Sequence, residues 1–125
     1  MSENPYRDAI QKAIAENDVI LFMKGTPEAP ACGFSARTVA TLQALETPFT
    51  AVDVLPDPRI RQELSALSGW PTIPQVFVKG ELIGGADIVE ELAATGELRQ
   101  KLESALGASN GSGEQRVVDV LAPAH

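Results

Sequence analysis

Apolar side chains recur along this chain with two different spacings, and each spacing predicts one kind of element. In residues 4–16 they recur every three or four positions, which predicts a helix with one buried face. Residues 19–23 form an unbroken apolar run, typical of a strand buried on both faces, and residues 49–54 predict a second strand. Between these strands we expect a helix from about Gly33 to Glu46, with Phe34 packed in the core.

The second half of the chain has clear start and turn signals. Asp57 followed by a proline is typical of a helix start, with the aspartate as N-cap and the proline at the first helical position. Two short apolar runs, residues 75–78 and 81–83, are separated by Lys-Gly and predict a β-hairpin. A further helix is expected near Asp87, and leucines spaced four apart continue the helical pattern to Leu106.

The expected order of elements is α-β-α-β-α-β-β-α-α. Strands that alternate with helices predict a parallel pair, and the closing hairpin adds antiparallel strands. We therefore expect an α/β fold with a small mixed four-stranded sheet flanked by helices, formed by one domain over residues 1–106. Residues 107–125 begin with glycine and serine and predict a flexible C-terminal tail. The apolar run 117–121 leaves docking open, but we favour an undocked tail.

Composition excludes some classes of partner. The chain has 125 residues and a formal net charge of -7, which disfavours nucleic acid as a partner because phosphate binding needs a basic face. It has no apolar run near the length that a membrane span requires, and its first residues do not resemble a secretory signal. We expect no membrane association and a cytoplasmic location.

The counts of cysteine and histidine narrow the chemistry. The chain has one cysteine, Cys32, so it cannot form an internal disulfide, which fits a reducing compartment. Its one histidine, His125, is the last residue, so neither a Cys-His nucleophile pair nor a zinc site is expected. Whatever Cys32 does requires a group from outside the chain.

Cys32 lies where a proline-rich loop meets a predicted helix. The N–H groups of a helix start favour an anion, and Lys24 at the end of the preceding strand adds a positive charge. Both features stabilise the thiolate, which is the nucleophilic and metal-binding form of cysteine. The alternative is an inert, buried cysteine. The flanking residues are loop-like rather than apolar, so we favour a reactive thiol.

Three separated motifs resemble those of the monothiol, CGFS-type glutaredoxins. They are Cys32–Ser35 (CGFS), eight residues after Lys24, then Trp70–Phe77 (WPTIPQVF) and Gly80–Ile88 (GELIGGADI). They occur in the same order as in that family, and the likeness covers about residues 4–106. The resemblance implies a thioredoxin fold with glutathione as the ligand. The glutathione-site residues that it implies, beside Cys32, are Lys24, Gly33, Phe34, Arg61, Ile73, Pro74, Gly85, Ala86 and Asp87.

The resemblance also implies a role for charges at both ends of glutathione. Lys24 and Arg61 would meet the glycyl carboxylate. The helix that follows Gly85 would receive the γ-glutamyl carboxylate through the N–H groups of Ala86 and Asp87. The Asp87 side chain would pair with the ammonium group and also serve as the N-cap of that helix.

The middle of glutathione would lie beside a proline. The resemblance implies a cis peptide between Ile73 and Pro74, preferred here over a simple strand-entry proline, which leaves the Ile73 backbone to pair with the ligand. Gly33 allows a ligand sulfur to approach the helix end. Core packing is the favoured role for Phe34 and ligand contact the alternative, whereas for Trp70 packing and ligand contact stay equally open.

Ser35 separates this class from the dithiol glutaredoxins, and one position, Ala86, departs from the pattern of the class itself. Ser35 stands where dithiol glutaredoxins have a second cysteine, so a mixed disulfide on Cys32 must be resolved by an external thiol such as glutathione. Ala86 stands where many members have a cysteine, which excludes an internal disulfide with Cys32.

Three functions fit these residues. The resemblance implies a homodimer that holds a bridging 2Fe–2S cluster through two Cys32 thiolates and two glutathione thiolates. Such a protein stores and transfers clusters in iron homeostasis, is a monomer without the cluster, and works with a BolA-like protein and apo iron–sulfur clients. The alternative is a glutathione-dependent oxidoreductase that removes glutathione from protein mixed disulfides; a pure interaction module is the third. The long loop before Cys32, a feature of the CGFS class, favours the cluster carrier, with at most weak enzymatic activity.

Overall fold

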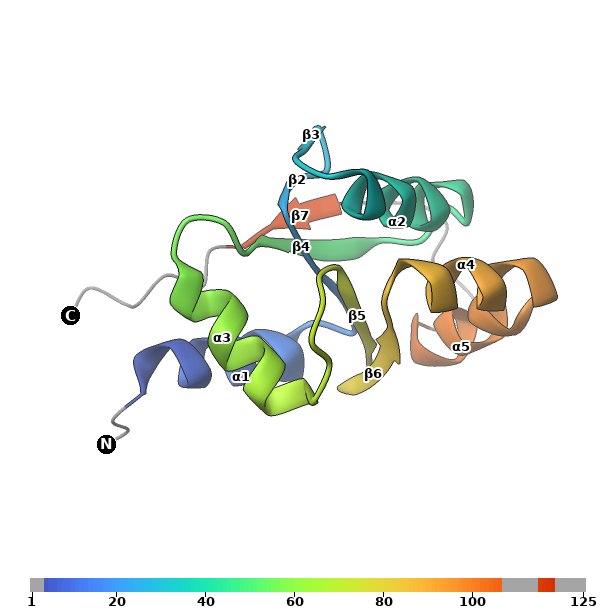
Figure 1. Ribbon diagram of the computed structural model, residues 1–125. Helices are drawn as coiled ribbons and strands as arrows, with labels where there is room; N and C mark the ends of the chain where they lie inside the picture. Colours follow the sequence, from blue (N-terminus) through green and yellow to red (C-terminus); the bar gives the residue numbers. More distant parts are fainter. Residues whose placement is uncertain (1–3, 107–114, 119–125) are drawn as a thin grey trace.

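A mixed β-sheet with helices on both faces forms the centre of the molecule (Figure 1). The computed structural model describes residues 4–106 and 115–118. No helix in these two ranges is both long enough and apolar enough to cross a bilayer. The elements are α1 (Pro5–Glu16), β1 (Val19–Met23), β2 (Gly25–Thr26), β3 (Ala29–Pro30), α2 (Gly33–Ala44), β4 (Phe49–Asp53), α3 (Pro58–Ser68), β5 (Gln75–Val78), β6 (Glu81–Gly84), α4 (Ala86–Thr95), α5 (Glu97–Leu106) and β7 (Gln115–Val117).

The four predicted strands are confirmed and lie in the order β6-β5-β1-β4. β1 runs parallel to β4 and antiparallel to β5, and β5 and β6 form the expected hairpin. Lys79 and Gly80 both take positive φ angles, 50° and 81°, as a tight hairpin turn requires. The fold is the expected small mixed sheet flanked by helices.

The side chains of β1 divide the core into two layers. Ile20 and Phe22 pack with α1 and α3, and the Phe22 ring meets Phe77 edge-on at 5.8 Å. Leu21 and Met23 point to the other face, where they pack with α2, α4 and α5. All five residues of β1 are buried, which confirms a strand covered on both faces.

A short C-terminal strand adds to the predicted sheet. β7 pairs in parallel with β4, and the Val118 N–H continues this pairing by donating to the Ala51 carbonyl at 2.9 Å. Val118 also packs, partly buried, against the layer of α1 and α3. The expectation of an undocked tail is therefore wrong for residues 115–118, where the free edge of β4 supplies the docking site. The other residues of 107–125 lie outside the described part of the chain, so the boundary at residue 106 stays a prediction.

Asp57 ties α3 to α1. Its side chain caps α3 by accepting the Arg59 N–H at 2.9 Å, as the sequence predicted, and also accepts the Tyr6 hydroxyl at 2.8 Å. The Arg59 guanidinium donates to the same carboxylate and lies 4.7 Å from the centre of the Tyr6 ring. Hydrogen bonds from the Arg59 side chain, the Arg59 backbone and Tyr6 hold the pKa of Asp57 far below its ordinary value. This cluster orients the helix that carries Arg61.

We predict that Asp57→Ala lowers the melting temperature by roughly 5 °C at neutral pH, because it removes the cap and the contact with α1. Since the folded-state pKa is depressed, the carboxylate stabilises the fold fully above the ordinary carboxyl pKa of about 4, and this stabilisation is lost as pH falls toward the folded value. The difference in melting temperature between wild type and variant should therefore narrow below about pH 4. Circular dichroism melts across pH measure it. Glu103→Ala, an exposed acid on α5, is the control; a gap that stays constant on acidification would contradict the assignment.

Candidate functional site

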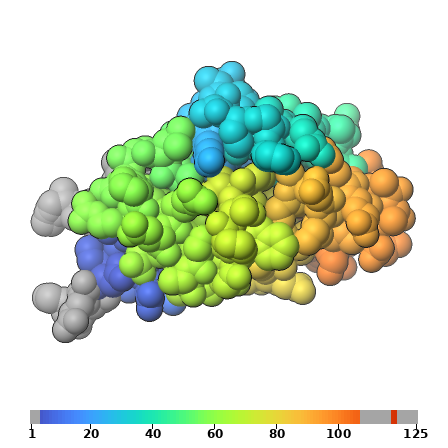
Figure 2. Space-filling view, viewed as in Figure 1, coloured from blue at the N-terminus to red at the C-terminus, as the bar shows by residue number. Residues whose placement is uncertain are grey.

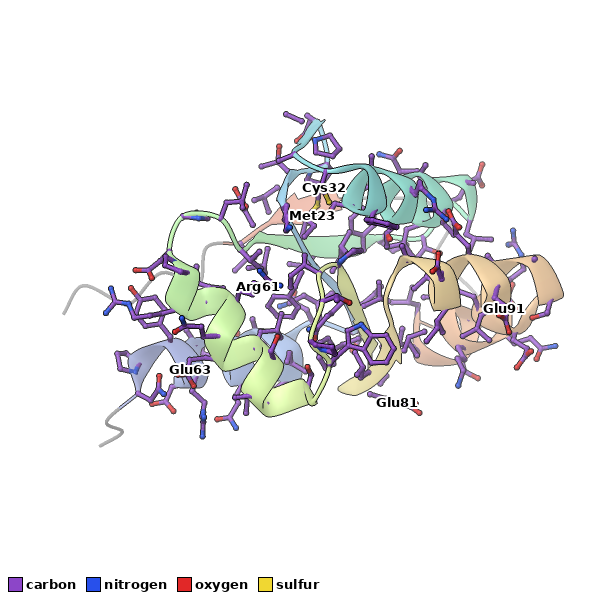
Figure 3. All side chains as sticks on the ribbon, viewed as in Figure 1. Met23, Cys32, Arg61, Glu63, Glu81 and Glu91 are labelled. Atoms are coloured by element: carbon purple, nitrogen blue, oxygen red, sulfur yellow. The ribbon has the colours of Figure 1, made fainter. Side chains whose placement is uncertain are left out.

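Cys32 is the N-cap residue of α2, at the junction predicted for it. Its backbone is extended, with φ -151° and ψ 156°, and its sulfur accepts the Ser35 N–H at 3.4 Å. The side chain is half-buried at the start of the helix (Figure 3). The sulfur thus occupies the place in which helix N–H groups favour a negative charge.

The Ser35 hydroxyl connects the sulfur to the end of β1. Ser35 is fully buried, and its Oγ accepts the backbone N–H of Lys24 at 3.0 Å and lies 3.4 Å from the Cys32 sulfur. Because the Lys24 N–H uses Oγ as an acceptor, the hydroxyl hydrogen is available to donate to a thiolate. Ser35 therefore stabilises the anion and fixes its distance from β1.

The surroundings of Cys32 favour its thiolate. Burial of the sulfur raises the pKa of the Cys32 thiol. The Ser35 hydroxyl, the N–H groups of Ser35 and Phe34, and the charge of Lys24 act in the opposite direction and together outweigh burial. The net pKa is below the ordinary value, as the position of Cys32 at a helix start predicted.

The loop before Cys32 is a small hairpin formed by β2 and β3. Gly25 makes its first corner at φ 89°, and a Cβ there would lie 2.5 Å from the Ala29 carbonyl oxygen. The Ala31 N–H closes the hairpin on the Lys24 carbonyl at 2.8 Å, and the Asp53 carboxylate accepts the Gly25 N–H at 2.9 Å. Glycine and proline in this segment predicted a loop; the paired strands within it were not predicted.

A groove of about 400 Å³ lies next to this helix start. Figure 2 shows that α2 in cyan, the segment around residue 75 in yellow-green and the start of α4 in orange meet on one face. The structure brings eight of the predicted site residues to the groove: Lys24, Phe34, Arg61, Ile73, Pro74, Gly85, Ala86 and Asp87. Cys32 and Gly33 are not lining residues; they directly precede Phe34, which is. Thr72 and Ile88, which were not predicted, also line the groove and lie within two of the recognised motifs. Trp70 lines it too.

Phe34 differs from the sequence expectation. It is 55% exposed and lines the groove instead of packing in the core. The buried face of α2 contains Ser35, Thr38 and Leu42, and successive residues are about 100° apart around a helix, so Phe34 points to the side of that face. The Arg37 guanidinium lies 5.6 Å from its ring centre. Of the two roles considered for Phe34, the structure therefore supports the one at the groove.

The start of α4 forms the other side of the groove. Gly85 is the N-cap and offers no capping side chain, so the expectation that Asp87 caps this helix is wrong. The reason is that the helix begins at Ala86, two residues before the Ile88 start that an N-cap at Asp87 would give, which leaves Asp87 inside its first turn. The Asp87 side chain is 85% exposed and lies 3.4 Å from the Arg37 guanidinium, which also pairs with Glu90.

The peptide bond between Ile73 and Pro74 is cis, as predicted. Both residues are buried where they line the groove, between α3 and α4. Lys24 and Arg61 give the groove two positive side chains in a chain whose net charge is -7. Across residues 4–106 and 115–118, no cluster of three or more histidine, cysteine, aspartate or glutamate side chains is suited to hold a metal ion.

Comparisons with known proteins cover this same region. The glutaredoxin family model matches residues 19–83. The probable monothiol glutaredoxin 2 of Rickettsia typhi is 50% identical over 103 residues, which is 82% of this chain and 93% of that protein. Glutaredoxin 4 of Escherichia coli K12 is 50% identical over 96 residues, 77% of this chain and 84% of that protein.

Solved structures with this fold include two of direct interest. The solution structure of reduced poplar apo GrxS14 superposes with a TM-score of 0.72 at 40% identity, over 82% of this chain and 94% of that one. A buckwheat glutaredoxin–glutathione complex superposes with a TM-score of 0.71 at 26% identity, over 84% of this chain and 96% of that one.

We predict that Ser35→Ala raises the pKa of Cys32, because the thiolate loses its hydroxyl donor. The rate of alkylation by iodoacetamide at neutral pH should fall severalfold, and the midpoint of its pH profile should move upward. The chain has one cysteine, so the label reports on this thiol alone.

Ser104→Ala, on the exposed surface of α5, is the matched control and should leave the profile unchanged. Cys32→Ser gives the background rate. An unchanged midpoint in Ser35→Ala would show that the helix N–H groups and Lys24 lower the pKa of Cys32 without the hydroxyl.

Proposed function

This chain belongs to the glutaredoxin family, with a single cysteine as in its monothiol members, and we propose that it binds glutathione and carries a bridging 2Fe–2S cluster as a homodimer. The observation that carries the proposal is the groove beside Cys32, which has two cations on one side and a helix start on the other. Glutathione has a carboxylate at each end, so this charge pattern suits it.

Each end of glutathione has a matching group. In this proposal the glycyl carboxylate pairs with Lys24 and Arg61, and the γ-glutamyl carboxylate accepts the N–H groups of Ala86 and Asp87. No capping side chain occupies the start of α4, so these groups are open to a ligand. The backbone of Ile73 then lies along the middle of the tripeptide. The buckwheat relative crystallised as a glutathione complex supports this ligand class.

Ligand arithmetic supports the shared cluster. A 2Fe–2S cluster takes four sulfur ligands, and one chain supplies a single thiolate. The described residues offer no cluster of other ligating side chains, and in this proposal the other three ligands come from outside the chain. A second copy of Cys32 and two glutathione thiolates complete the set. Cys32 fits this role because its sulfur is partly exposed and its thiolate is favoured.

The same proposal implies the partners and the location of the protein. The cluster is carried and then passed on, and it bridges two chains, so the protein is a dimer with the cluster and a monomer without it. A BolA-like protein and apo iron–sulfur proteins receive or regulate the cluster, which places the chain in cluster storage, cluster transfer and iron homeostasis. A lone free cysteine suits the reducing cytoplasm, where we place the protein.

The lowered pKa of Cys32 favours a second candidate, a glutathione-dependent oxidoreductase. The Cys32 thiolate would attack the glutathione sulfur of a protein–glutathione disulfide, and the protein would leave as its thiolate. A second glutathione thiolate would attack the resulting Cys32–glutathione disulfide, which releases oxidised glutathione and restores Cys32. The β2–β3 hairpin favours the carrier over this enzyme because it lies directly before Cys32 and shapes the surface beside the sulfur. We propose that it slows the attack of the second glutathione on the Cys32–glutathione disulfide.

Anaerobic reconstitution with iron, sulfide and glutathione tests the carrier. We expect a coloured dimer by visible spectroscopy and size-exclusion chromatography, formed only with glutathione and returning to monomer when the cluster is lost. Arg61→Ala should lose its cluster several times faster than wild type, because a carboxylate contact of the glutathione ligand is gone. Arg99→Ala, an exposed arginine of α5, should match wild type. A colourless monomer under all conditions would overturn the carrier, and equal retention in Arg61→Ala would overturn glutathione ligation at this groove.

Turnover on a glutathionylated protein tests the enzyme. If the carrier is the main function, the deglutathionylation rate with this chain should exceed the rate with free glutathione by less than about tenfold, set only by the larger thiolate fraction of Cys32. Cys32→Ser supplies the uncatalysed rate. A deglutathionylation rate far above this tenfold limit would make the oxidoreductase the main function.

A further inference from the structure

The wall of the groove formed by residues 70–72 has no regular secondary structure. It lies between the end of α3 and the start of β5, and Pro71 and Thr72 are exposed. A segment of this kind keeps one conformation only if its backbone groups find partners elsewhere. Its shape, and with it one side of the groove, therefore depends on the side chains that hold it.

Gln75 is the main partner of this wall. Its Nε2 donates to the Trp70 carbonyl at 3.0 Å and to the Thr72 carbonyl at 3.1 Å, so both amide hydrogens are used (on either side of Pro71). The Arg61 guanidinium is 3.5 Å from the Pro71 carbonyl, a longer contact. Two short bonds from one amide fix the direction of the segment, because they set the spacing of two carbonyls.

Gln75 is an unusual residue for its position. It is fully buried in β5, the strand beside β1, between apolar neighbours. Its Oε1 is buried and has no hydrogen-bond partner among the described residues. An unpaired buried oxygen destabilises a fold, and an apolar side chain would avoid this penalty. Packing in the core thus does not account for a glutamine here, whereas its hold on the wall does.

The wall meets the other side of the groove through Trp70. A Cβ at Gly85 would lie 3.2 Å from the Trp70 Nε1, so the indole packs against the backbone that starts α4. Trp70 Nε1 is itself buried without a hydrogen-bond partner in the described structure, and its position is therefore set by packing and by the backbone that carries it. A shift of Trp70 would change the space in front of Gly85.

We propose that Gln75 is the positioning residue of this groove: its amide holds residues 70–72 so that Trp70 and Thr72 fit a γ-glutamyl tripeptide between them and α4. The proposal rests on the proposed glutathione function for its ligand. Its structural half, that Gln75 sets the position of Trp70, does not. Gln75 acts through the wall and does not line the groove.

The test compares Gln75→Leu and Gln75→Glu, both made in Cys32→Ser so that no mixed disulfide forms. Leucine removes both donors, and glutamate keeps the shape while it offers carboxylate oxygens to two carbonyls. Trp70 is the only tryptophan of the chain, so intrinsic fluorescence reports on the wall without any ligand. We expect both variants to shift Trp70 emission to longer wavelength and to raise its quenching by acrylamide. Calorimetric titration should give roughly tenfold weaker binding of glutathione.

Thr50→Val is the matched control for stability. It removes a buried hydrogen bond of 2.8 Å, from Thr50 to Asn17, on a strand that does not line the groove. It should lower the melting temperature without altering Trp70 emission or glutathione affinity. Because the second variant keeps the volume of glutamine, a failure of Gln75→Leu to fold leaves Gln75→Glu to decide.

The outcomes separate the two proposals. Unchanged emission and quenching in the Gln75 variants would overturn the positioning role, whatever glutathione does. Altered emission with affinity within twofold of the Cys32→Ser parent would overturn the effect on the ligand. If neither wild type nor the Cys32→Ser parent binds glutathione while the emission shifts are present, the proposed function is overturned, and Gln75 remains the residue that positions the wall. Equal losses in Thr50→Val would make the effect one of stability alone and overturn the proposal.

Discussion

The parallel pairing of β1 with β4 is the constraint on which the site depends. Its register sets Met23 beside Asp53, so the two strands end together. The Asp53 carboxylate then accepts the N–H groups of Gly25 and Leu55, which joins the chain leaving β1 to the chain leaving β4. The carboxyl ends of parallel strands are where α/β folds commonly place their ligands, because loops of different origin meet there. In this chain the loop that leaves β1 leads directly to the sulfur.

A second hydrogen bond at the end of β1 connects the strand to the reactive sulfur. The backbone N–H of Lys24 donates to the Ser35 hydroxyl, and that hydroxyl contacts the Cys32 sulfur. The strand end, the first turn of α2 and the thiolate thus share one buried oxygen. If β1 ended elsewhere, the acceptor of this bond would need another donor, and the hydroxyl could not serve the sulfur in the same way. The lowered pKa of Cys32 therefore depends on the end of β1 as well as on the first turn of α2.

Much of the fold could be predicted from the sequence because local signals agree with the final contacts. The N-cap at Asp57, the turn at Lys79 and Gly80, and the apolar run of β1 each act within a few residues. What could not be predicted depends on distant partners. β7 has three residues and exists through its pairing with β4. The cap at Gly85 uses no side chain, and so it leaves little trace in the sequence. The groove residues were predicted from motif resemblance. One of those motifs includes Gln75, but the motif does not show that its amide donates to the Trp70 and Thr72 carbonyls.

The carrier and the enzyme need the same thiolate, so the difference between them cannot lie in the pKa of Cys32. With one cysteine, both functions depend on glutathione held next to the sulfur. A cluster ligand must stay bound, because its loss releases the cargo, whereas an enzyme must let oxidised glutathione leave. A rigid groove favours retention. Two features fix parts of this groove: the Ala31 N–H closes the β2–β3 hairpin on the Lys24 carbonyl, and Gln75 holds the Trp70 carbonyl in residues 70–72. In the proposed complex, both would restrict the movement of glutathione. Whether the protein acts as a carrier or as an enzyme therefore depends on how tightly the groove retains glutathione rather than on the reactivity of the Cys32 sulfur.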